Sequence, residues 1–257
     1  MNEQLEQQPD IEAILKQAVF NTVKQREVYP DYPSERLTSD NQEVARQLAE
    51  GRISLLPEGP WDAGYAHLKP QTEEEFRLLR LQGYNFDDAG RPLHPWLYDM
   101  LCDPDVGVVT GTGSYWKLGP NKTADPIVIT NEEVPHVLLV LRSDNNLWAF
   151  AGGFLDPGDD GIAAGRRENM EEAGLWLPDE PEVIIYEGVV ADARTTTYAW
   201  AETFAALWRV DKQMPLTPDY TEVKDARWFP INKLPARLHG SHGALLNEVI
   251  RREISRK

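Results

Sequence analysis

The chain has 257 residues, enough for one large domain or two smaller ones with a sizeable buried core. Its 42 acidic and 26 basic side chains give a formal net charge of −16, which argues against a general nucleic-acid-binding surface. Cys102 is the only cysteine, so an intrachain disulfide is excluded, and we expect a free, buried thiol.

The N-terminal residues carry no recognisable targeting signal. Residues 1–10 are polar and acidic, with neither the apolar core of a signal peptide nor the Arg-rich character of a mitochondrial presequence. The longest apolar run, residues 137–141, is too short to cross a bilayer. We therefore expect a cytoplasmic protein with no membrane partner.

The N-terminal part predicts helices separated by loops. Apolar residues recur at helical spacing over residues 11–19, which indicates an amphipathic helix that packs on a core or forms a dimer contact. Capping-box pairs open two short helices, expected over residues 40–51 and 72–83, and each ends near a glycine. Residues 57–70, rich in Pro and Gly, predict a loop, and residues 87–90 predict a turn.

From about residue 111 the pattern becomes rich in strands. The predicted strands cover residues 137–142, 147–150, 183–190, 203–210 and 227–231. A turn at residues 143–146 separates the first two, and a loop over residues 192–200 links the third and fourth. Residues 245–250 predict a final amphipathic helix. Strands flanked by helices indicate an α/β sandwich.

The most informative stretch is residues 153–175. Asp, Pro and Gly at residues 156–160 predict a turn that ends in a helix-capping aspartate. A helix is expected over residues 162–173, and Gly174 stands where a left-handed residue closes a helix. This stretch therefore predicts a loop followed directly by a helix.

Three acids of this helix share one face, because Glu168, Glu171 and Glu172 stand at i, i+3 and i+4. Carboxylates this close repel one another unless a cation lies between them, and Mg²⁺ takes oxygen ligands of this kind together with substrate phosphates. Acids near the last turn also oppose the helix dipole, which indicates a role other than helix stability. A solvated acidic face is the alternative, and spacing alone leaves both interpretations open.

The same stretch resembles the Nudix box. The resemblance is carried by Gly153, five residues, Asp159, seven residues, Arg167-Glu168, two residues, Glu171-Glu172, one residue and Gly174-Leu175. Asp159 departs from the pattern, since the family has Glu there and pairs it with the box Arg; the shorter acid predicts a looser contact with Arg167. Asn169 departs as well, bringing a polar group to a packing position.

Segments around the box resemble the mitochondrial-type ADP-ribose pyrophosphatases. Residues 111–126 match the segment before the box and residues 188–203 the segment after it. Residues 227–231 and 238–242 match the closing strand and the start of the final helix. The C-terminal domain of the ADP-ribose-gated melastatin-type cation channel shares these segments, and its vertebrate forms carry degraded boxes. The resemblance runs in the same order from about Tyr29 onward.

The resemblance implies the Nudix fold, an α/β/α sandwich of the α/β class with a mixed sheet, plus a smaller N-terminal cap domain. We expect the N-terminal helix and cap domain over residues 1–105 and the Nudix hydrolase domain over residues 106–257, with the substrate between them. The chain is expected to be a monomer or a homodimer.

The activity that the resemblance implies is hydrolysis of the pyrophosphate of ADP-ribose to AMP and ribose 5-phosphate. Mg²⁺ is the implied metal, with Mn²⁺ as an alternative, and Glu168, Glu171 and Glu172 are its implied ligands. Arg167 completes the implied catalytic set. The general base is left open between Glu172 and Glu202.

The implied substrate-binding residues lie mostly outside the box. Asp192 would accept ribose hydroxyls and Arg194 would hold an anionic group, unless the two only form a loop salt bridge. His242 matches a histidine near the nucleotide, with helix capping or packing as the alternative. Gly153 and Lys117 complete the set, and Lys117 stands where the family has Arg.

Two other functions stay open. The chain is either a Nudix hydrolase for another nucleoside diphosphate derivative, or a catalytically weak sensor that binds ADP-ribose. In a sensor, Asp159 and Asn169 would be early signs of a degraded box. Because Arg167 and all three glutamates are present, the sequence favours an enzyme.

Overall fold

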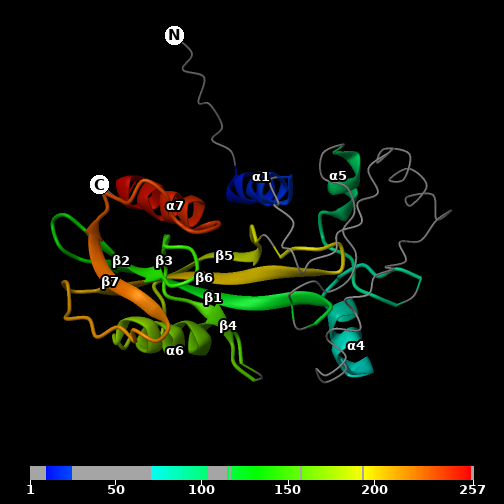
Figure 1. Cartoon of the computed structure of the whole chain (residues 1–257), viewed down its shortest axis with the longest axis horizontal. Coiled ribbons are helices and arrows are strands. Elements are labelled where there is room, and N and C mark those ends of the chain that lie inside the picture. The colour runs from blue at the N-terminus through cyan, green and yellow to red at the C-terminus, as the bar shows by residue number, and fades with distance from the viewer. Residues whose placement is uncertain are drawn as a thin grey trace, which may run out of the picture. The chain divides into compact units, whose positions relative to one another are not determined.

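The computed structural model describes residues 10–24, 71–88, 90–103, 115, 117–156, 158–192 and 194–255 of the chain (Figure 1). Its helices are α1 (Ile11–Lys24), α4 (Glu73–Leu81), α5 (Leu97–Cys102), α6 (Gly161–Ala173) and α7 (His242–Ser255). Its strands are β1 (Gly119–Thr130), β2 (His136–Arg142), β3 (Trp148–Ala149), β4 (Gly153–Phe154), β5 (Val183–Val189), β6 (Ala199–Val210) and β7 (Val223–Pro230). None of the helices in these ranges has the length and apolar character that a membrane span requires.

The described strands form a seven-stranded sheet in the order β3-β2-β1-β6-β5, with β4 paired to β1 and β7 paired to β2. β1 pairs antiparallel with β2 and β4, and β2 pairs antiparallel with β3 and β7. The backbone N–H of Gly119 donates to the carbonyl of Tyr198. Further along, the N–H of Asn131 donates to the carbonyl of Val210, so β1 and β6 run parallel. The sheet is therefore mixed, as predicted.

The two faces of the sheet bury separate apolar clusters, because successive side chains of a strand point to opposite sides. In β2, Val137 and Leu139 belong to a cluster that also contains apolar residues of α7. Leu138 and Val140 belong to a second cluster, which contains Ala173 at the end of α6. Figure 1 shows α7 and α6 on opposite faces of the sheet. This layering confirms the predicted α/β sandwich.

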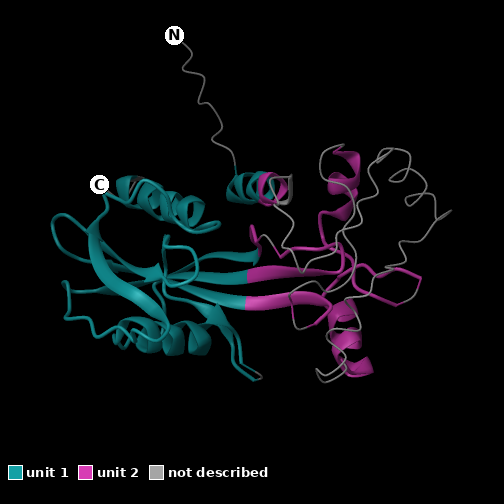
Figure 2. Ribbon diagram, viewed as in Figure 1, with its two compact units in different colours: residues 1–18, 123–188, 203–257 teal, residues 19–122, 189–202 magenta. Residues whose placement is uncertain are grey.

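The chain divides into two compact units (Figure 2). Unit 1 consists of Met1–Ala18, Thr123–Gly188 and Thr203–Lys257, and unit 2 of Val19–Lys122 and Val189–Glu202. The chain passes from one unit to the other within α1, β1, β5 and β6. The units thus interleave along the chain, and the single domain boundary after residue 105 stays a prediction.

Most predicted elements in the described ranges are present. The helix expected over residues 72–83 is α4, and its capping box forms both reciprocal hydrogen bonds between Thr72 and Glu75. The strand expected from residue 203 begins earlier, at Ala199, so the last two residues of the predicted loop belong to β6. Cys102 is exposed, so the expectation of a buried thiol was wrong. The helix expected over residues 40–51 and the loop over residues 57–70 lie outside the described residues.

The sequence did not predict β1 or α5. β1 is twelve residues long and contains two prolines, which disfavour a strand prediction, yet it lies at the centre of the sheet. α5 has six residues and no side-chain cap, so it carries no start signal. Both elements are defined by burial against other parts of the fold rather than by local pattern.

The end of α6 yields a stability prediction. Gly174 has φ +68, and a Cβ there would lie 1.9 Å from Thr217 Oγ1. Gly83 has φ +91 with open space around it, so a substitution there measures the free-energy cost of the left-handed backbone alone. We expect Gly83→Ala to cost about 1 kcal/mol of unfolding free energy and Gly174→Ala at least about 2 kcal/mol. Chemical denaturation measures both; equal costs would show that the contact with Thr217 has no energetic weight.

Candidate active site

The loop–helix unit predicted from the sequence is present in unit 1. Asp160 is the N-cap of α6, and its carboxylate accepts the backbone N–H of Ala163 at 2.8 Å. Gly174 ends the helix in the left-handed conformation. The helix therefore begins and ends on local signals, which fixes the rotation that places Glu168 and Glu172 toward the preceding loop.

That loop approaches the helix closely at two glycines. The backbone N–H of Gly152 donates to Glu172 Oε2 at 3.0 Å. A Cβ at Gly153 would lie 2.7 Å from the carboxyl atoms of Glu168. The absence of a side chain at Gly153 thus makes room for the carboxylate of Glu168. Gly153, expected at the substrate, acts here through its missing side chain.

Arg167 lies between two of the three box glutamates. Its Nη1 donates to Glu168 Oε1 at 2.7 Å and to Glu171 Oε2 at 3.1 Å, and its Nη2 donates to the carbonyl of Phe154. The guanidinium therefore supplies the cation that two neighbouring carboxylates require, and it also ties the helix to β4. The carboxylate of Glu171 is about half exposed, whereas that of Glu168 is buried.

The two departures from the box pattern have visible consequences. Asp159 Oδ2 lies 3.4 Å from Arg167 Nε, a longer contact than the guanidinium makes with Glu168. This fits the looser contact expected of the shorter acid. Asn169 is fully buried, and its Nδ2 donates to the carbonyl of Leu175 at 2.6 Å. Its Oδ1 has no hydrogen-bond partner, so the polar group at this packing position is only half satisfied.

The box carboxylates are electrostatically perturbed. Burial raises the pKa of Glu172 to about 8, against the opposing hydrogen bond from Gly152. Burial also raises the pKa of Glu168, although contact with Arg167 opposes the shift. Repulsion from Glu222, an exposed acid just before β7, adds to both shifts. A cation bound nearby would favour the ionised form of both carboxyl groups and so lower both pKa values.

The metal site implied by the sequence is not preformed. Among the residues that the structure describes, no group of three or more His, Cys, Asp and Glu side chains is arranged to hold a metal ion. Arg167 contacts both Glu168 and Glu171. The donor set itself fits a hard divalent cation, because it consists of carboxylate oxygens. Burial raises the pKa of two of its members, Glu168 and Glu172. Metal binding by Glu168, Glu171 and Glu172 stays a prediction.

His242, the first residue of α7, is buried in unit 1. Its Nδ1 accepts the backbone N–H of Phe150 at 2.8 Å, and its ring stacks on the Phe150 ring. Its Nε2 lies 3.6 Å from Asp125 Oδ1. Burial lowers the pKa of His242, so the ring is neutral. These contacts give His242 the packing role that the sequence left open, and nucleotide contact stays a prediction.

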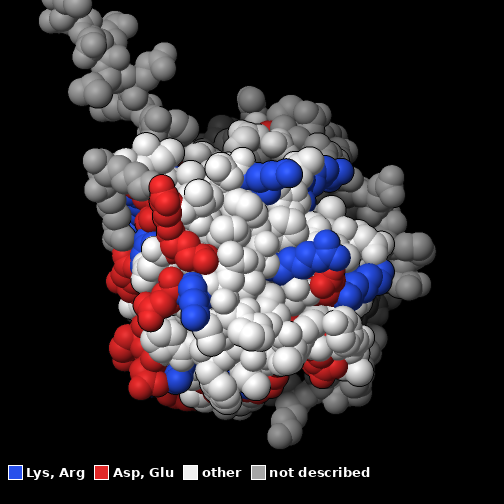
Figure 3. Space-filling view, turned by 90° about the vertical axis from the view of Figure 1, so that its left-hand side faces the viewer, with Lys and Arg blue, Asp and Glu red and all other residues white. Residues whose placement is uncertain are grey.

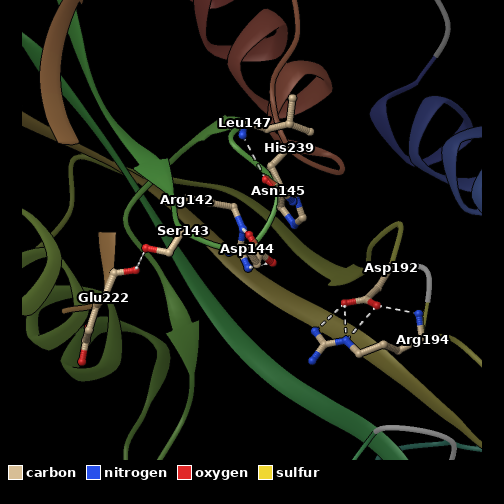
Figure 4. A network of polar contacts seen from close by, with 9 residues as sticks. All are labelled: Arg142, Ser143, Asp144, Asn145, Leu147, Asp192, Arg194, Glu222 and His239. Atoms are coloured by element: carbon tan, nitrogen blue, oxygen red, sulfur yellow. Dashed lines mark hydrogen bonds and ion pairs between the residues drawn. The ribbon is translucent and has the colours of Figure 1, made fainter. Parts of the chain in front are cut away.

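Asp192 and Arg194 form an ion pair in unit 2 (Figure 4). Arg194 Nη2 donates to Asp192 Oδ2 at 2.6 Å, and Arg194 Nε donates to Oδ1 at 3.0 Å. The guanidinium lies 5.0 Å from the ring centroid of Tyr115. The loop salt bridge that the sequence offered as an alternative is thus present. Lys117, also in unit 2, is exposed, and its carbonyl accepts Asn121 Nδ2.

Glu202, considered as a general base, is buried in unit 2. Tyr84 Oη donates to its Oε2 at 2.6 Å, and Trp200 Nε1 donates to its Oε1 at 2.7 Å. Trp200 is fully buried and its ring contacts the rings of Tyr84 and His94. With an aromatic donor on each oxygen, the carboxylate of Glu202 has a structural role within unit 2.

Two acids beside the box were not found from the sequence. Asp125 on β1 is buried, and Glu222 lies in the segment before β7, where the carbonyl of Glu222 accepts Ser143 Oγ (Figure 4). Asp125 lies within the matched segment over residues 111–126 but was not singled out there, and Glu222 lies outside every matched segment. The face in Figure 3 carries mostly acids toward its left edge and mostly bases toward its right edge.

The NUDIX domain family model matches residues 120–249, which is half of the chain. The chain belongs to the NUDIX family. The match covers both glycines of the loop, all of α6 and the box glutamates that it carries.

Relatives of known name agree with this assignment. The chain is 32% identical over 178 residues to a Caenorhabditis elegans protein named as a nudix hydrolase, covering 64% of this chain and 65% of that protein. It is 31% identical over 173 residues to the transient receptor potential cation channel subfamily M member-like 2 of Nematostella vectensis, covering 54% and 11%. It is 26% identical over 198 residues to the mitochondrial ADP-ribose pyrophosphatase of Rattus norvegicus, covering 63% and 54%. The chain spans less than two thirds of each relative.

Solved NUDIX structures resemble the chain more weakly. The NUDIX domain of Shewanella oneidensis NrtR, complexed with ADP ribose, is 23% identical with a TM-score of 0.44, covering 52% of this chain and 89% of that one. A MutT/nudix family protein from Enterococcus faecalis is 17% identical with a TM-score of 0.46, covering 78% and 76%. Both scores are low, so the assignment to the NUDIX family depends on the sequence match.

The raised pKa of Glu172 predicts a pH-dependent stability of the metal-free protein. Between the usual value of 4.5 and about 8, the folded state keeps a proton that the unfolded chain has lost. Raising the pH through this window therefore favours unfolding. In chelator-treated protein we expect the melting temperature of the wild type to fall across this window relative to Glu172→Gln.

The exposed Glu180→Gln serves as the control and should follow the wild type. Parallel curves for wild type and Glu172→Gln would contradict the shift.

Proposed function

We propose that this NUDIX protein hydrolyses the pyrophosphate of ADP-ribose to AMP and ribose 5-phosphate with the help of Mg²⁺. The observation that carries the proposal is the cluster of Glu168, Glu171 and Glu172 on α6, with the turn at Gly152 and Gly153 packed against it. Diphosphates are polyanions, and the enzymes that cleave them hold the phosphates through carboxylate-bound Mg²⁺.

Each box residue has a distinct role in the proposal. Glu168, Glu171 and Glu172 would hold the metal, which when bound neutralises the diphosphate and lowers the pKa of an attacking water. The N–H of Gly152 orients Glu172 through its hydrogen bond. Arg167 orients Glu168 and Glu171, and it balances their charge before the metal binds.

We assign the general base to Glu172 rather than to Glu202. A base must lie within reach of the attacking water, and Glu172 belongs to the carboxylate cluster of α6 that would hold the metal. Glu202 accepts hydrogen bonds on both carboxylate oxygens. Its release would leave the donors of Tyr84 and Trp200 without their acceptor, which costs free energy.

ADP-ribose is the proposed substrate because the rat relative is an ADP-ribose pyrophosphatase by name. Asp192 and Arg194 are the proposed contacts for its ribose and an anionic group, through exchange of the ion pair for ligand contacts. His242, Gly153 and Lys117 complete the proposed set. A cytoplasmic location, Mn²⁺ as a second metal, and a monomer or homodimer stay predictions.

The competing proposal is an ADP-ribose sensor, favoured by the likeness to a cation channel subunit. The long contact between Asp159 and Arg167 and the half-satisfied Asn169 would then be signs of relaxed constraint on the box. A hydrolase for another nucleoside diphosphate is the second alternative. Product analysis with ADP-ribose and a panel of sugar nucleotides and dinucleotides separates all three.

Replacement of Glu171 or Glu172 by Gln tests the enzyme. Each change keeps the side-chain shape but removes a charge, so we expect kcat to fall by about 10³-fold with the fold intact. AMP and ribose 5-phosphate are quantified by chromatography with ADP-ribose and Mg²⁺. Glu180→Gln, an exposed acid outside the cluster, should keep wild-type turnover. Tight binding of ADP-ribose by the wild type without products would instead establish a sensor.

A further inference from the structure

Asp125 is a buried carboxylate that the proposed function does not use. It lies on β1, and the hydroxyl of Thr203 on β6 donates to its Oδ2 at 2.5 Å. Thr203 is itself almost fully buried. A charge-bearing group in such a place needs partners, because its transfer from water is costly. The hydrogen bond from Thr203 therefore fixes where the carboxylate of Asp125 lies.

The turn before the box packs directly on Asp125. A Cβ at Gly152 would lie 2.8 Å from Asp125 Oδ1 and 2.5 Å from the carbonyl oxygen of Ala124. The next residue, Gly153, pairs with Ala124 across β1 and β4. The turn thus packs against Ala124 and Asp125 of β1 on one side. On its other side it packs against the carboxylates of Glu168 and Glu172.

His242 connects the same carboxylate to the start of the turn. The backbone N–H of Phe150 can only donate, so Nδ1 of His242 is the acceptor and the neutral ring carries its proton on Nε2. That Nε2 faces Asp125 Oδ1 at 3.6 Å. The segment from Phe150 to Gly152 is thereby bonded at its first residue to His242, and its last residue lies so close to Asp125 that a side chain would not fit between them.

We infer that Asp125, Thr203 and His242 form a buried brace that holds the Gly152–Gly153 turn against Glu168 and Glu172, which makes Asp125 and Thr203 positioning residues for the metal-binding carboxylates. All members of the brace belong to unit 1. The inference rests on the proposed function only in taking Glu168 and Glu172 as metal ligands. Loss of the groups that hold metal ligands in their orientation commonly lowers the affinity for the metal.

The brace makes a prediction about metal affinity that does not depend on the substrate. In Thr203→Val the hydroxyl is lost at nearly constant volume, so Asp125 Oδ2 loses its donor and the turn is free to shift. We expect Mn²⁺ affinity, titrated by electron paramagnetic resonance on folded protein, to fall by about tenfold or more. Thr203→Ser keeps the hydroxyl and should restore affinity to within about twofold of the wild type.

The matched control is Thr130→Val. Thr130 is also a fully buried threonine of unit 1, and its hydroxyl accepts the backbone N–H of His136 at 2.9 Å, at the other end of β1. Its loss should lower the melting temperature but leave Mn²⁺ affinity unchanged. If Thr203→Val does not fold, Asp125→Asn, which keeps the shape and changes the charge, takes its place with the same expected fall in affinity.

Wild-type Mn²⁺ affinity in folded Thr203→Val would overturn the brace, as would equal losses in Thr130→Val and Thr203→Val. A wild type that binds no Mn²⁺ would also overturn it, because there would be no site to position. If Mn²⁺ affinity falls as expected while the wild type forms no AMP from ADP-ribose, the brace stands and the proposed substrate fails.

Discussion

The arrangement of the candidate site depends on the Gly152–Gly153 turn, which packs closely against β1 on one side and against α6 on the other. Below it, the carbonyl of Ala124 would clash with any side chain at Gly152; above it, Glu168 occupies the space that a side chain at Gly153 would need. The backbone therefore replaces side chains as the packing surface between β1 and α6. This constraint brings an N–H to Glu172 and places the carboxylate of Glu168 beside the start of β4.

The second determinant is the balance of charge around Arg167. One guanidinium contacts Glu168 and Glu171 directly and lies near Asp156 and Asp159. The carboxylates outnumber it, so the cluster keeps an excess of negative charge that a divalent cation can neutralise. Arg167 thus acts as a resident counter-ion that stabilises the cluster without filling its coordination capacity. We expect a bound metal to weaken the contact of the guanidinium with Glu168 or Glu171, because the cation takes over its role as counter-ion.

Local signals made much of the fold predictable. Asp160 and Gly174 bound α6, and Thr72 with Glu75 opens α4, because caps and left-handed glycines act within a few residues. The strand β2 was found because five consecutive apolar residues cannot be exposed. β1 was missed since its prolines obscure the pattern, and its central position results from pairing with distant strands. The interleaving of the two units has no local signature at all.

The site was predictable only where it has fixed spacing. Glu168, Glu171 and Glu172 were found because helical periodicity places them on one face. Asp125 and Thr203 are 78 residues apart in sequence and meet only through the parallel pairing of β1 with β6. His242 was predicted as a substrate contact, and its hydrogen bond with Phe150 depends on a separation of 92 residues. Residues that support the site residues without belonging to the motif can therefore be recognised only once the fold is known.

The most direct test is a crystal structure with Mn²⁺ and its anomalous scattering. We expect an ion with oxygen ligands from Glu168, Glu171 and Glu172 at about 2.2 Å, and Arg167 moved away from at least one of the two carboxylates that it contacts here. The turn at Gly152 and Gly153 should stay in place. An ion bound elsewhere at saturating Mn²⁺, with Arg167 still between Glu168 and Glu171, would contradict the account.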